Sequence, residues 1–214
     1  MVLDNYRTTL DWWLVPLAKA LRRVHPDVFT WASLAVAALG GIAFWKSDSS
    51  GAGLKLLLVA WGCVLLNSIL DLLDGKVAKL TGQATPRGDY LDHAVDRFSD
   101  VLFLTGLAFS GWVRMEIGLL ALLGTLLTSY MGTQAQAVGL KRNYAGLLGR
   151  ADRMVLLLII PLAQWWWTMR GYDVPWFVSL LEAVMAYFAL MGLLTTVQRF
   201  VSGLRGFGPD GRVR

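Results

Sequence analysis

Four aspartates stand at helical spacing in a sequence that is otherwise rich in apolar residues. Asp71 and Asp74 are three residues apart, and Asp92 and Asp96 are four residues apart, so each pair projects from one face of a helix. Two such faces opposed across a short connection bring four carboxylates together. Like charges that close require a counter-charge, and carboxylate oxygens select Mg²⁺ or Mn²⁺ rather than zinc. The spacing therefore predicts a divalent metal site with all four aspartates as ligands.

Glycines and basic residues accompany the aspartates. Gly75 and Gly88 lack side chains, so a backbone and a diphosphate can come close there, and Lys79 and Arg87 can neutralise phosphate oxygens. Metal ions, a diphosphate and basic side chains are the components of a phosphoryl-transfer site. The alternative is that residues 71–100 form a solvated loop with helix-capping aspartates. Six of the fifteen acidic residues fall within these thirty positions, which favours the site.

The elements that carry these residues are predicted to be membrane-spanning helices. Of 214 residues, 56% are hydrophobic and only 16% are charged, and the mean hydropathy is +0.51, which is unusual for a soluble domain. About 20 apolar residues are needed to cross the hydrocarbon core as a helix. Six runs fit, with approximate bounds 29–46, 52–71, 95–113, 115–137, 153–169 and 175–197. The fold class is therefore predicted to be all-α, a polytopic membrane protein with six transmembrane helices.

An amphipathic segment precedes the first predicted span. Within residues 5–23 the apolar side chains fall near one helical face and the basic ones lie elsewhere. This pattern predicts an interfacial helix in the headgroup plane, with a helix packed on protein as the alternative. Pro26 ends it, because the residue before a proline is disfavoured in α geometry. We therefore divide the chain into an interfacial helix and turn (1–28), a six-helix transmembrane catalytic domain (29–200) and a basic cytoplasmic tail (201–214).

Basic residues are distributed unevenly between the two ends of the predicted spans. Sixteen of the twenty Lys and Arg residues fall in the N-terminal segment, the second-to-third and fourth-to-fifth connection regions and the tail. Only Lys46, Lys55, Arg114 and Arg170 fall on the opposite side. By the positive-inside bias, both termini and the aspartate cluster are predicted to face the cytoplasm at the inner membrane. The net charge of +5 favours anionic headgroups and phosphates, and the sequence shows no folded basic module for nucleic acid.

The run from Asp71 to Asp96 resembles the signature of the CDP-alcohol phosphotransferase family, D-x2-D-G-x2-A-R-x8-G-x3-D-x3-D. Every fixed position matches except that Lys79 stands where the family has arginine. The segment Pro26-Asp27-Val28-Phe29-Thr30 is similar to the family's Pro-(Asn/Asp)-x-x-Thr turn before the first span. The size of the chain and the six-span layout also resemble the family over nearly the whole length.

This resemblance implies a homodimeric enzyme that transfers a phosphatidyl-type group from a CDP-linked lipid to a small alcohol and releases CMP. It implies two Mg²⁺ or Mn²⁺ ions held by the four aspartates, with Asp96 binding the second ion or acting as the general base. The residues that the resemblance places around the CDP-lipid are Pro26, Asp27, Thr30, Gly75, Ala78, Lys79, Thr85 and Gly88. A lysine at position 79 keeps the charge but lacks the planar donor fork of arginine, which weakens or rearranges contacts to the donor.

The acceptor site is expected in three further segments. Residues that resemble the acceptor region of inositol-phosphate-using members lie in 129–136, 149–153 and 197–199. Gly132 and Gln134 stand where those members have a lysine and an arginine, whereas Arg153 and Arg199 match. Because two arginines can still hold a phosphate, the predicted acceptor is a phosphorylated polyol, with glycerol phosphate ahead of inositol phosphate. The alternative is that these arginines only mark cytoplasmic helix ends.

The same residues allow alternative functions. An unphosphorylated acceptor such as serine is the alternative within the class. A divalent-cation transporter using the same aspartates is the alternative outside it, and it would place acidic residues near mid-membrane on several spans, with an internal repeat. In this sequence the acids lie near predicted helix ends and no repeat is visible. A catalytically silent lipid-binding scaffold is disfavoured because Asp96 is intact.

Overall fold

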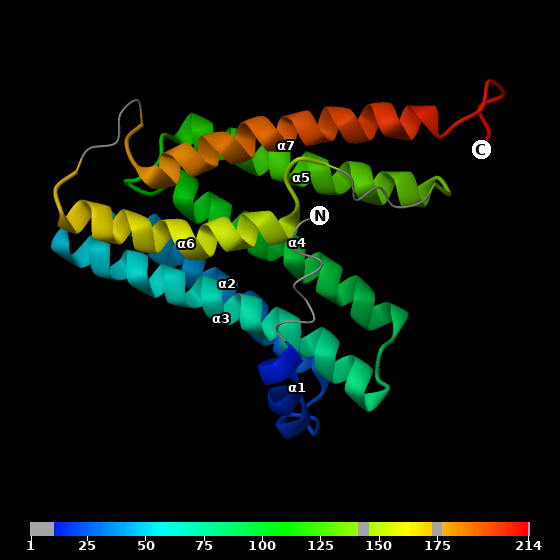
Figure 1. Cartoon of the computed structure of the whole chain (residues 1–214), viewed down its shortest axis with the longest axis horizontal. Coiled ribbons are helices and arrows are strands. Elements are labelled where there is room, and N and C mark those ends of the chain that lie inside the picture. Colours follow the sequence, from blue (N-terminus) through cyan, green and yellow to red (C-terminus); the bar gives the residue numbers. More distant parts are fainter. Residues whose placement is uncertain (1–10, 141–145, 173–176, 214) are drawn as a thin grey trace.

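The computed structural model describes residues 11–140, 146–172 and 177–213, and every regular element in these ranges is a helix. In chain order the helices are α1 (Asp11–Ala20), α2 (Pro26–Trp45), α3 (Gly51–Thr81), α4 (Pro86–Ala108), α5 (Met115–Ala137), α6 (Arg150–Met169) and α7 (Leu180–Arg205). Each of the six predicted spans corresponds to one of the helices α2 to α7 (Figure 1). The predicted all-α class is therefore confirmed for the described part of the chain.

Four of these helices are long and apolar enough to cross a membrane, namely α2, α3, α5 and α7. This property indicates a membrane protein. Helices α4 and α6, of 23 and 20 residues, do not meet the same requirements of length, hydropathy and low charge. The arrangement of six transmembrane helices thus stays a prediction.

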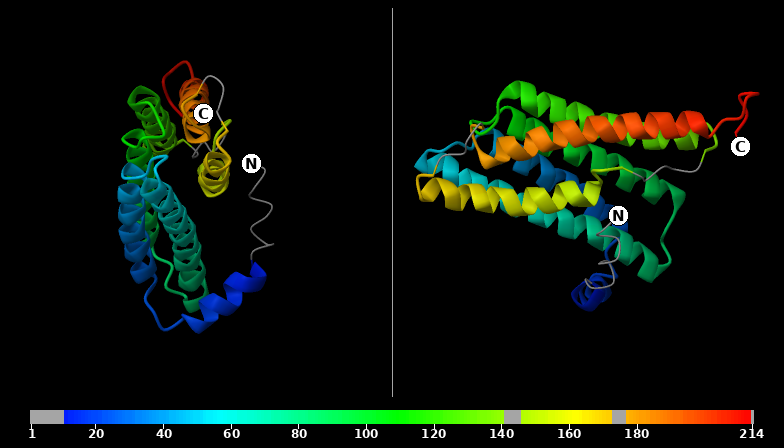
Figure 2. Two further views of the ribbon diagram at one scale, coloured as in Figure 1. Left: turned by 90° about the vertical axis from the view of Figure 1, so that its left-hand side faces the viewer. Right: turned by 45° about the horizontal axis from the view of Figure 1, so that its top comes forward.

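The helices α2 to α7 pack in a closed ring. Contacts link α2 to α3, α3 to α6, α6 to α7, α7 to α5, α5 to α4 and α4 back to α2, and Figure 2 shows the ring end-on. Because the chain reverses direction between successive helices, the C-terminus of α3 and the N-termini of α4 and α6 point toward the same side of the molecule, and α6 begins part-way along α3 (Figure 1). That side therefore gathers residues that are far apart in the sequence.

Glycines allow the closest helix contacts in the ring. A Cβ placed on Gly106 of α4 would lie 2.2 Å from the carbonyl oxygen of Gly41 in α2, and one on Gly192 of α7 would lie 2.9 Å from the backbone of Gly124 in α5. Small residues of this kind let membrane helices approach backbone to backbone, where dispersion contacts are strongest. The two glycine pairs hold α4 against α2 and α7 against α5.

Helix α1 packs on the outside of the ring against α3. Leu14 and Ala18 of α1 are buried together with Leu73 and Val77 of α3, so the apolar face of α1 is covered at least in part by protein. This contact is the alternative that the amphipathic pattern left open. The predicted helix over 5–23 is shorter in the structure, because 21–24 form a turn, and residues 5–10 lie outside the described residues.

Two predicted boundaries need correction. Residues Pro26 to Thr30 were expected in a turn, but they form the first turn of α2. Proline is favoured at the first helical position, where its missing N–H is not needed, and the His25 side chain caps the helix by accepting from Asp27 N at 3.3 Å. The tail was expected from residue 201, but α7 continues to Arg205.

Candidate active site

A short link between α3 and α4 places the two aspartate pairs opposite each other on neighbouring helices. Helix α3 runs unbroken for 31 residues to Thr81 and ends at Gly82, whose φ of 69° is the left-handed conformation typical of a helix C-cap. Thr85 then starts α4 as its N-cap, because its Oγ1 accepts a hydrogen bond from Gly88 N at 3.1 Å. Residues 71–100 are therefore helical except for 82–85, which contradicts the solvated-loop alternative.

Three of the four predicted ligands meet in space. Asp71 of α3 and Asp92 and Asp96 of α4 each offer a carboxylate oxygen, and these oxygens lie within 4.8 Å of one another. Asp96 is buried, while Asp71 and Asp92 are half-buried. Of the four carboxylates that the spacing predicts to converge, these three are brought together by the structure.

Asp74 is held separately from that group of three. Its Oδ2 accepts a hydrogen bond of 2.7 Å from Thr30 Oγ1 at the start of α2, and both side chains are buried. The hydroxyl fixes the rotamer of the carboxylate, and Asp74 lies one helical turn from Asp71 on α3. The sequence placed Thr30 around the CDP-lipid, whereas this contact gives it a role in positioning a carboxylate.

A cation of the protein lies among the carboxylates. Arg150, the first residue of α6, places Nη1 3.1 Å from Asp71 Oδ2 and Nη2 2.5 Å from Asp96 Oδ1. The first contact is a hydrogen bond, whereas Asp96 Oδ1 accepts no hydrogen bond from the described residues. Sequence reasoning grouped Arg150 with the acceptor segment and did not place it in the metal site.

A second set of charges lies directly behind Asp96. Asp100, one turn further along α4, pairs with Arg153 Nη2 at 3.0 Å and with Arg97 Nη1 at 2.9 Å. Asp100 and Arg153 are both buried, and Arg97 also donates to the hydroxyl of Ser129 in α5. The predicted acceptor residue Arg153 is thus tied to α4 by an ion pair that no sequence pattern had indicated.

The other predicted acceptor residue lies on α7. Arg199 Nη1 donates a hydrogen bond of 2.7 Å to the carbonyl oxygen of Thr128 in α5. The segments 129–136 and 197–199 are therefore brought together by the packing of α5 against α7.

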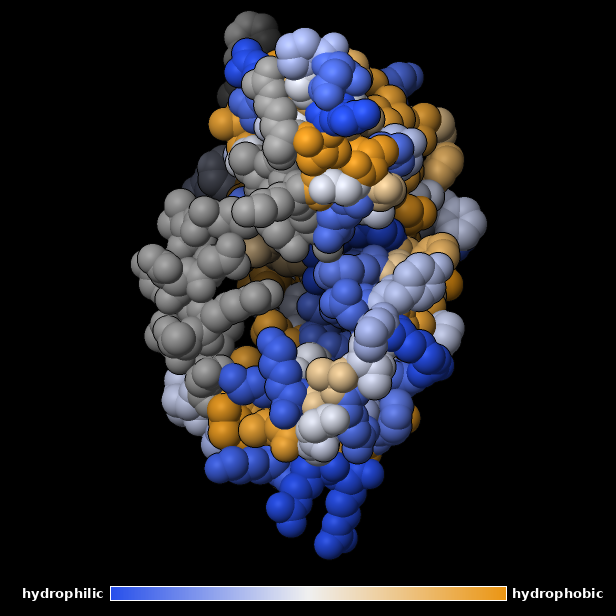
Figure 3. All heavy atoms as spheres, turned by 90° about the vertical axis from the view of Figure 1, so that its right-hand side faces the viewer, coloured by the Kyte–Doolittle hydropathy of each residue, from blue (hydrophilic) through white to orange (hydrophobic). Residues whose placement is uncertain are grey.

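The residues predicted around the CDP-lipid differ in their surroundings. A Cβ added to Gly75 would meet no atom of the described residues within 4 Å, so these residues leave open space beside the helix there. Lys79 is exposed and Ala78 half-buried. Asp27 forms an ion pair of 2.6 Å with Arg87, which links the starts of α2 and α4. Figure 3 shows hydrophilic side chains gathered over this end of the molecule around a hollow in its surface.

The donor set fits a hard divalent cation. It consists of carboxylate oxygens alone, and oxygen ligands suit Mg²⁺ and Mn²⁺. Asp96 Oδ1 is buried and lies 2.5 Å from Arg150 Nη2 without hydrogen-bond geometry, so a positive charge of the protein already stands beside this oxygen. A bound metal ion would compete with Arg150 for the same carboxylate oxygens.

Comparison with known proteins identifies the class. The sequence profile described as CDP-alcohol phosphatidyltransferase matches residues 23–199. An archaetidylinositol phosphate synthase of Aeropyrum pernix is 32% identical over 203 residues, covering 94% of this chain and 95% of the relative. A phosphatidylinositol phosphate synthase of Cutibacterium acnes is 31% identical over 215 residues, covering 94% and 97%.

A solved structure agrees with this result. The crystal structure of a phosphatidylinositol phosphate synthase of Mycobacterium tuberculosis with CDP-DAG bound superimposes with a TM-score of 0.71, at 25% identity, over 94% of this chain and 98% of that one. The chain belongs to the CDP-alcohol phosphatidyltransferase family and is a transferase of phospholipid biosynthesis.

Proposed function

We propose that this protein transfers a phosphatidyl-type group from a CDP-linked lipid to inositol phosphate and releases CMP. The observation that carries the proposal is the convergence of Asp71, Asp92 and Asp96 within 4.8 Å from two helices. The relatives named as archaetidylinositol and phosphatidylinositol phosphate synthases support the acceptor. They favour inositol phosphate over glycerol phosphate, which stands first in the prediction from the sequence.

The aspartates have distinct roles in this reaction. Asp71, Asp74, Asp92 and Asp96 would hold two ions of Mg²⁺ or Mn²⁺, which when bound supply charge neutralisation for the diphosphate. Asp96 takes the proton of the acceptor hydroxyl as general base. The acceptor oxygen bonds to the phosphorus that carries the lipid, and the bond from that phosphorus to CMP breaks. Thr30 keeps Asp74 oriented through its 2.7 Å hydrogen bond.

Recognition of the substrates involves the residues around this cluster. The residues proposed to surround the CDP moiety are Pro26, Asp27, Gly75, Ala78, Lys79, Thr85 and Gly88. The open side of Gly75 gives a diphosphate room to approach the α3 backbone, and exposed Lys79 offers a positive charge. Arg153 and Arg199, on α6 and α7, are proposed to bind the phosphate of the acceptor. Gly132 and Gln134 do not supply further cations, so the acceptor phosphate relies on fewer charges here.

The membrane arrangement is part of the proposal. We place the hydrophilic end shown in Figure 3 at the cytoplasmic boundary of the inner membrane, which lets the site meet a soluble acceptor and a lipid donor together. A homodimer is also proposed, and light scattering of the purified protein in detergent would measure its mass.

The reaction can be tested directly. Purified protein is incubated with CDP-diacylglycerol and Mg²⁺ or Mn²⁺, and CMP release is measured with inositol 1-phosphate, glycerol 3-phosphate, inositol and serine. We expect metal-dependent CMP only with phosphorylated acceptors, fastest with inositol 1-phosphate. Asp96→Asn should abolish turnover, whereas Asp89→Asn is the matched control, because Asp89 is exposed on the same helix. Absence of metal-dependent CMP with every acceptor, or full turnover by Asp96→Asn, would contradict the proposal.

A further inference from the structure

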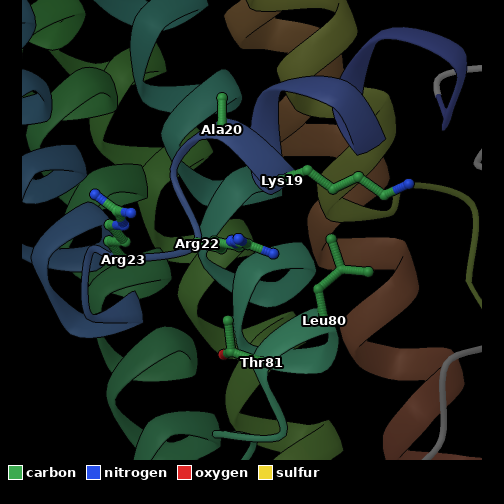
Figure 4. Close-up of a pocket in the computed structure, with 6 residues that line it drawn as sticks. All are labelled: Lys19, Ala20, Arg22, Arg23, Leu80 and Thr81. Carbon is green, nitrogen blue, oxygen red and sulfur yellow. The ribbon is translucent and has the colours of Figure 1, made fainter.

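A basic cavity lies at the last turn of α3, beyond the aspartates along the helix. Its volume is about 730 Å³, and it opens between the end of α1 and the last turn of α3. The residues that line it are Lys19, Ala20, Arg22, Arg23, Leu80 and Thr81. Figure 4 shows Lys19 and Arg22 close to the helical turn from which Leu80 and Thr81 project.

This cavity is distinct from the active site by helix geometry. Leu80 follows Asp71 by nine residues, and at about 100° per residue it lies roughly half a turn away on α3. Leu73 and Val77, on the same side as Leu80, pack beneath α1. Along the axis, Leu80 lies roughly 13 Å beyond Asp71 and roughly 9 Å beyond Asp74, at about 1.5 Å per residue, so a ligand in the cavity would contact α3 past the aspartates.

The cavity has an excess of positive charge. Lys19, Arg22 and Arg23 are exposed, and within the described parts of the chain none of them forms an ion pair. The C-termini of α1 and α3, which both end here, contribute about one negative charge together, at roughly half a charge each. With three cations, the net charge around the cavity is therefore roughly two positive charges, which favours binding of an anion.

Apolar side chains beside the cations indicate the kind of anion. Leu80, which lines the cavity, is 46% exposed. Trp12 and Leu17, on the helix α1 that ends at the cavity, are 79% and 37% exposed, on a protein whose long helices are apolar enough to cross a membrane. A soluble phosphate would contact only the cations, whereas a phospholipid presents a phosphate together with acyl chains. Basic clusters at a membrane surface recognise anionic lipids in this manner.

We propose that this cavity binds the phosphate of an anionic phospholipid headgroup and thereby clamps α1 onto α3. Lys19 and Arg22 precede the segment matched by the family profile, which begins at residue 23. The residues that line the cavity include none of the four aspartates and none of the residues proposed around the CDP moiety.

Native mass spectrometry of the full-length protein in detergent tests this site. The protein is titrated separately with dioleoyl phosphatidylglycerol, dioleoyl phosphatidylcholine and inorganic phosphate, and bound adducts are counted. Each cation near an anionic headgroup is worth roughly a fivefold change in affinity. We expect tighter binding of phosphatidylglycerol than of phosphatidylcholine, and a loss on the order of 25-fold in K19Q/R22Q.

Two further variants test whether lipid binding depends on this cavity or only on the overall positive charge of the protein. The charge-conserving K19R/R22K should retain binding, and so should R205Q/R212Q, which removes two cations at the end of α7 and beyond. Equal binding of both lipids, unchanged affinity in K19Q/R22Q, or an equal loss in R205Q/R212Q would overturn the proposal. Displacement of phosphatidylglycerol by an equal concentration of inorganic phosphate would also overturn it, by assigning the cavity to a soluble phosphate compound.

Discussion

Replacement of Arg150 by glutamine should make the stability of this protein depend strongly on divalent metal. Three carboxylates with oxygens within 4.8 Å of one another repel by about 3.5 kcal/mol per pair at an effective dielectric constant of about 20, or about 10 kcal/mol in total. The contacts of Arg150 at 3.1 and 2.5 Å attract by about 5 and 7 kcal/mol on the same scale. The two attractions together are at least as large as the repulsion among three ionised carboxylates, so without metal this one side chain compensates for it.

The expected effect follows from removing that charge. Removing one partner of a buried ion pair lowers the free energy of unfolding by about 3–5 kcal/mol. In the presence of a chelator, Arg150→Gln should therefore unfold about 10 °C below the parent protein. Saturating Mn²⁺ should remove most of this difference, because the ion then supplies the positive charge. The variant should also bind Mn²⁺ about 10-fold more tightly or better, since Arg150 no longer competes for the same oxygens.

Thermal unfolding with chelator or Mn²⁺, together with Mn²⁺ titration followed by electron paramagnetic resonance, measures both effects. Arg153→Gln is the matched control, because Arg153 lies one turn along α6 and pairs with Asp100, which is not one of the three clustered carboxylates. It should be destabilised equally with and without Mn²⁺. If Arg150→Gln loses the same stability in both conditions, or binds Mn²⁺ more weakly, the reasoning is refuted.

Three other changes test the remaining contacts. Thr30→Val removes the hydroxyl that donates to buried Asp74. It should lower kcat/KM for CMP release about 10- to 100-fold, as expected for about 1.5–3 kcal/mol, and Thr30→Ser should restore the activity. A change confined to the KM for CDP-lipid would instead indicate that Thr30 contacts the donor directly. Glu182 is a fully buried carboxylate that accepts hydrogen bonds from Arg114 Nε at 2.7 Å and from Val178 N at 2.7 Å. Glu182→Gln should lower the free energy of unfolding by about 1–3 kcal/mol. This loss is measured as a lower Tm, and the effect of metal on the Tm should not change. Gly106→Val places a Cβ 2.2 Å from a backbone oxygen of α2. It should lower the Tm more than Gly203→Val on α7, where an added Cβ meets no atom within 4 Å among the residues that the structure describes.

The sequence by itself determined the class of this protein and the core of its chemistry. Apolar runs of span length specify helices, because a backbone in hydrocarbon must satisfy its own hydrogen bonds. Within a helix the periodicity is fixed, so spacings of three and four residues place Asp71 beside Asp74 and Asp92 beside Asp96 before any fold is known. The signature around them led to the family that the comparisons then showed.

Only the tertiary structure decided which side chains meet across the helices. Thr30 and Asp74 are 44 residues apart, and Asp71 and Arg150 are 79 residues apart, so no local periodicity relates them. Their contacts depend on the order in which the helices close the ring and on glycine pairs such as Gly41 and Gly106 that set how closely they approach. For the same reason, packing rather than spacing set Asp74 apart from the other three aspartates and brought a cation of α6 among them.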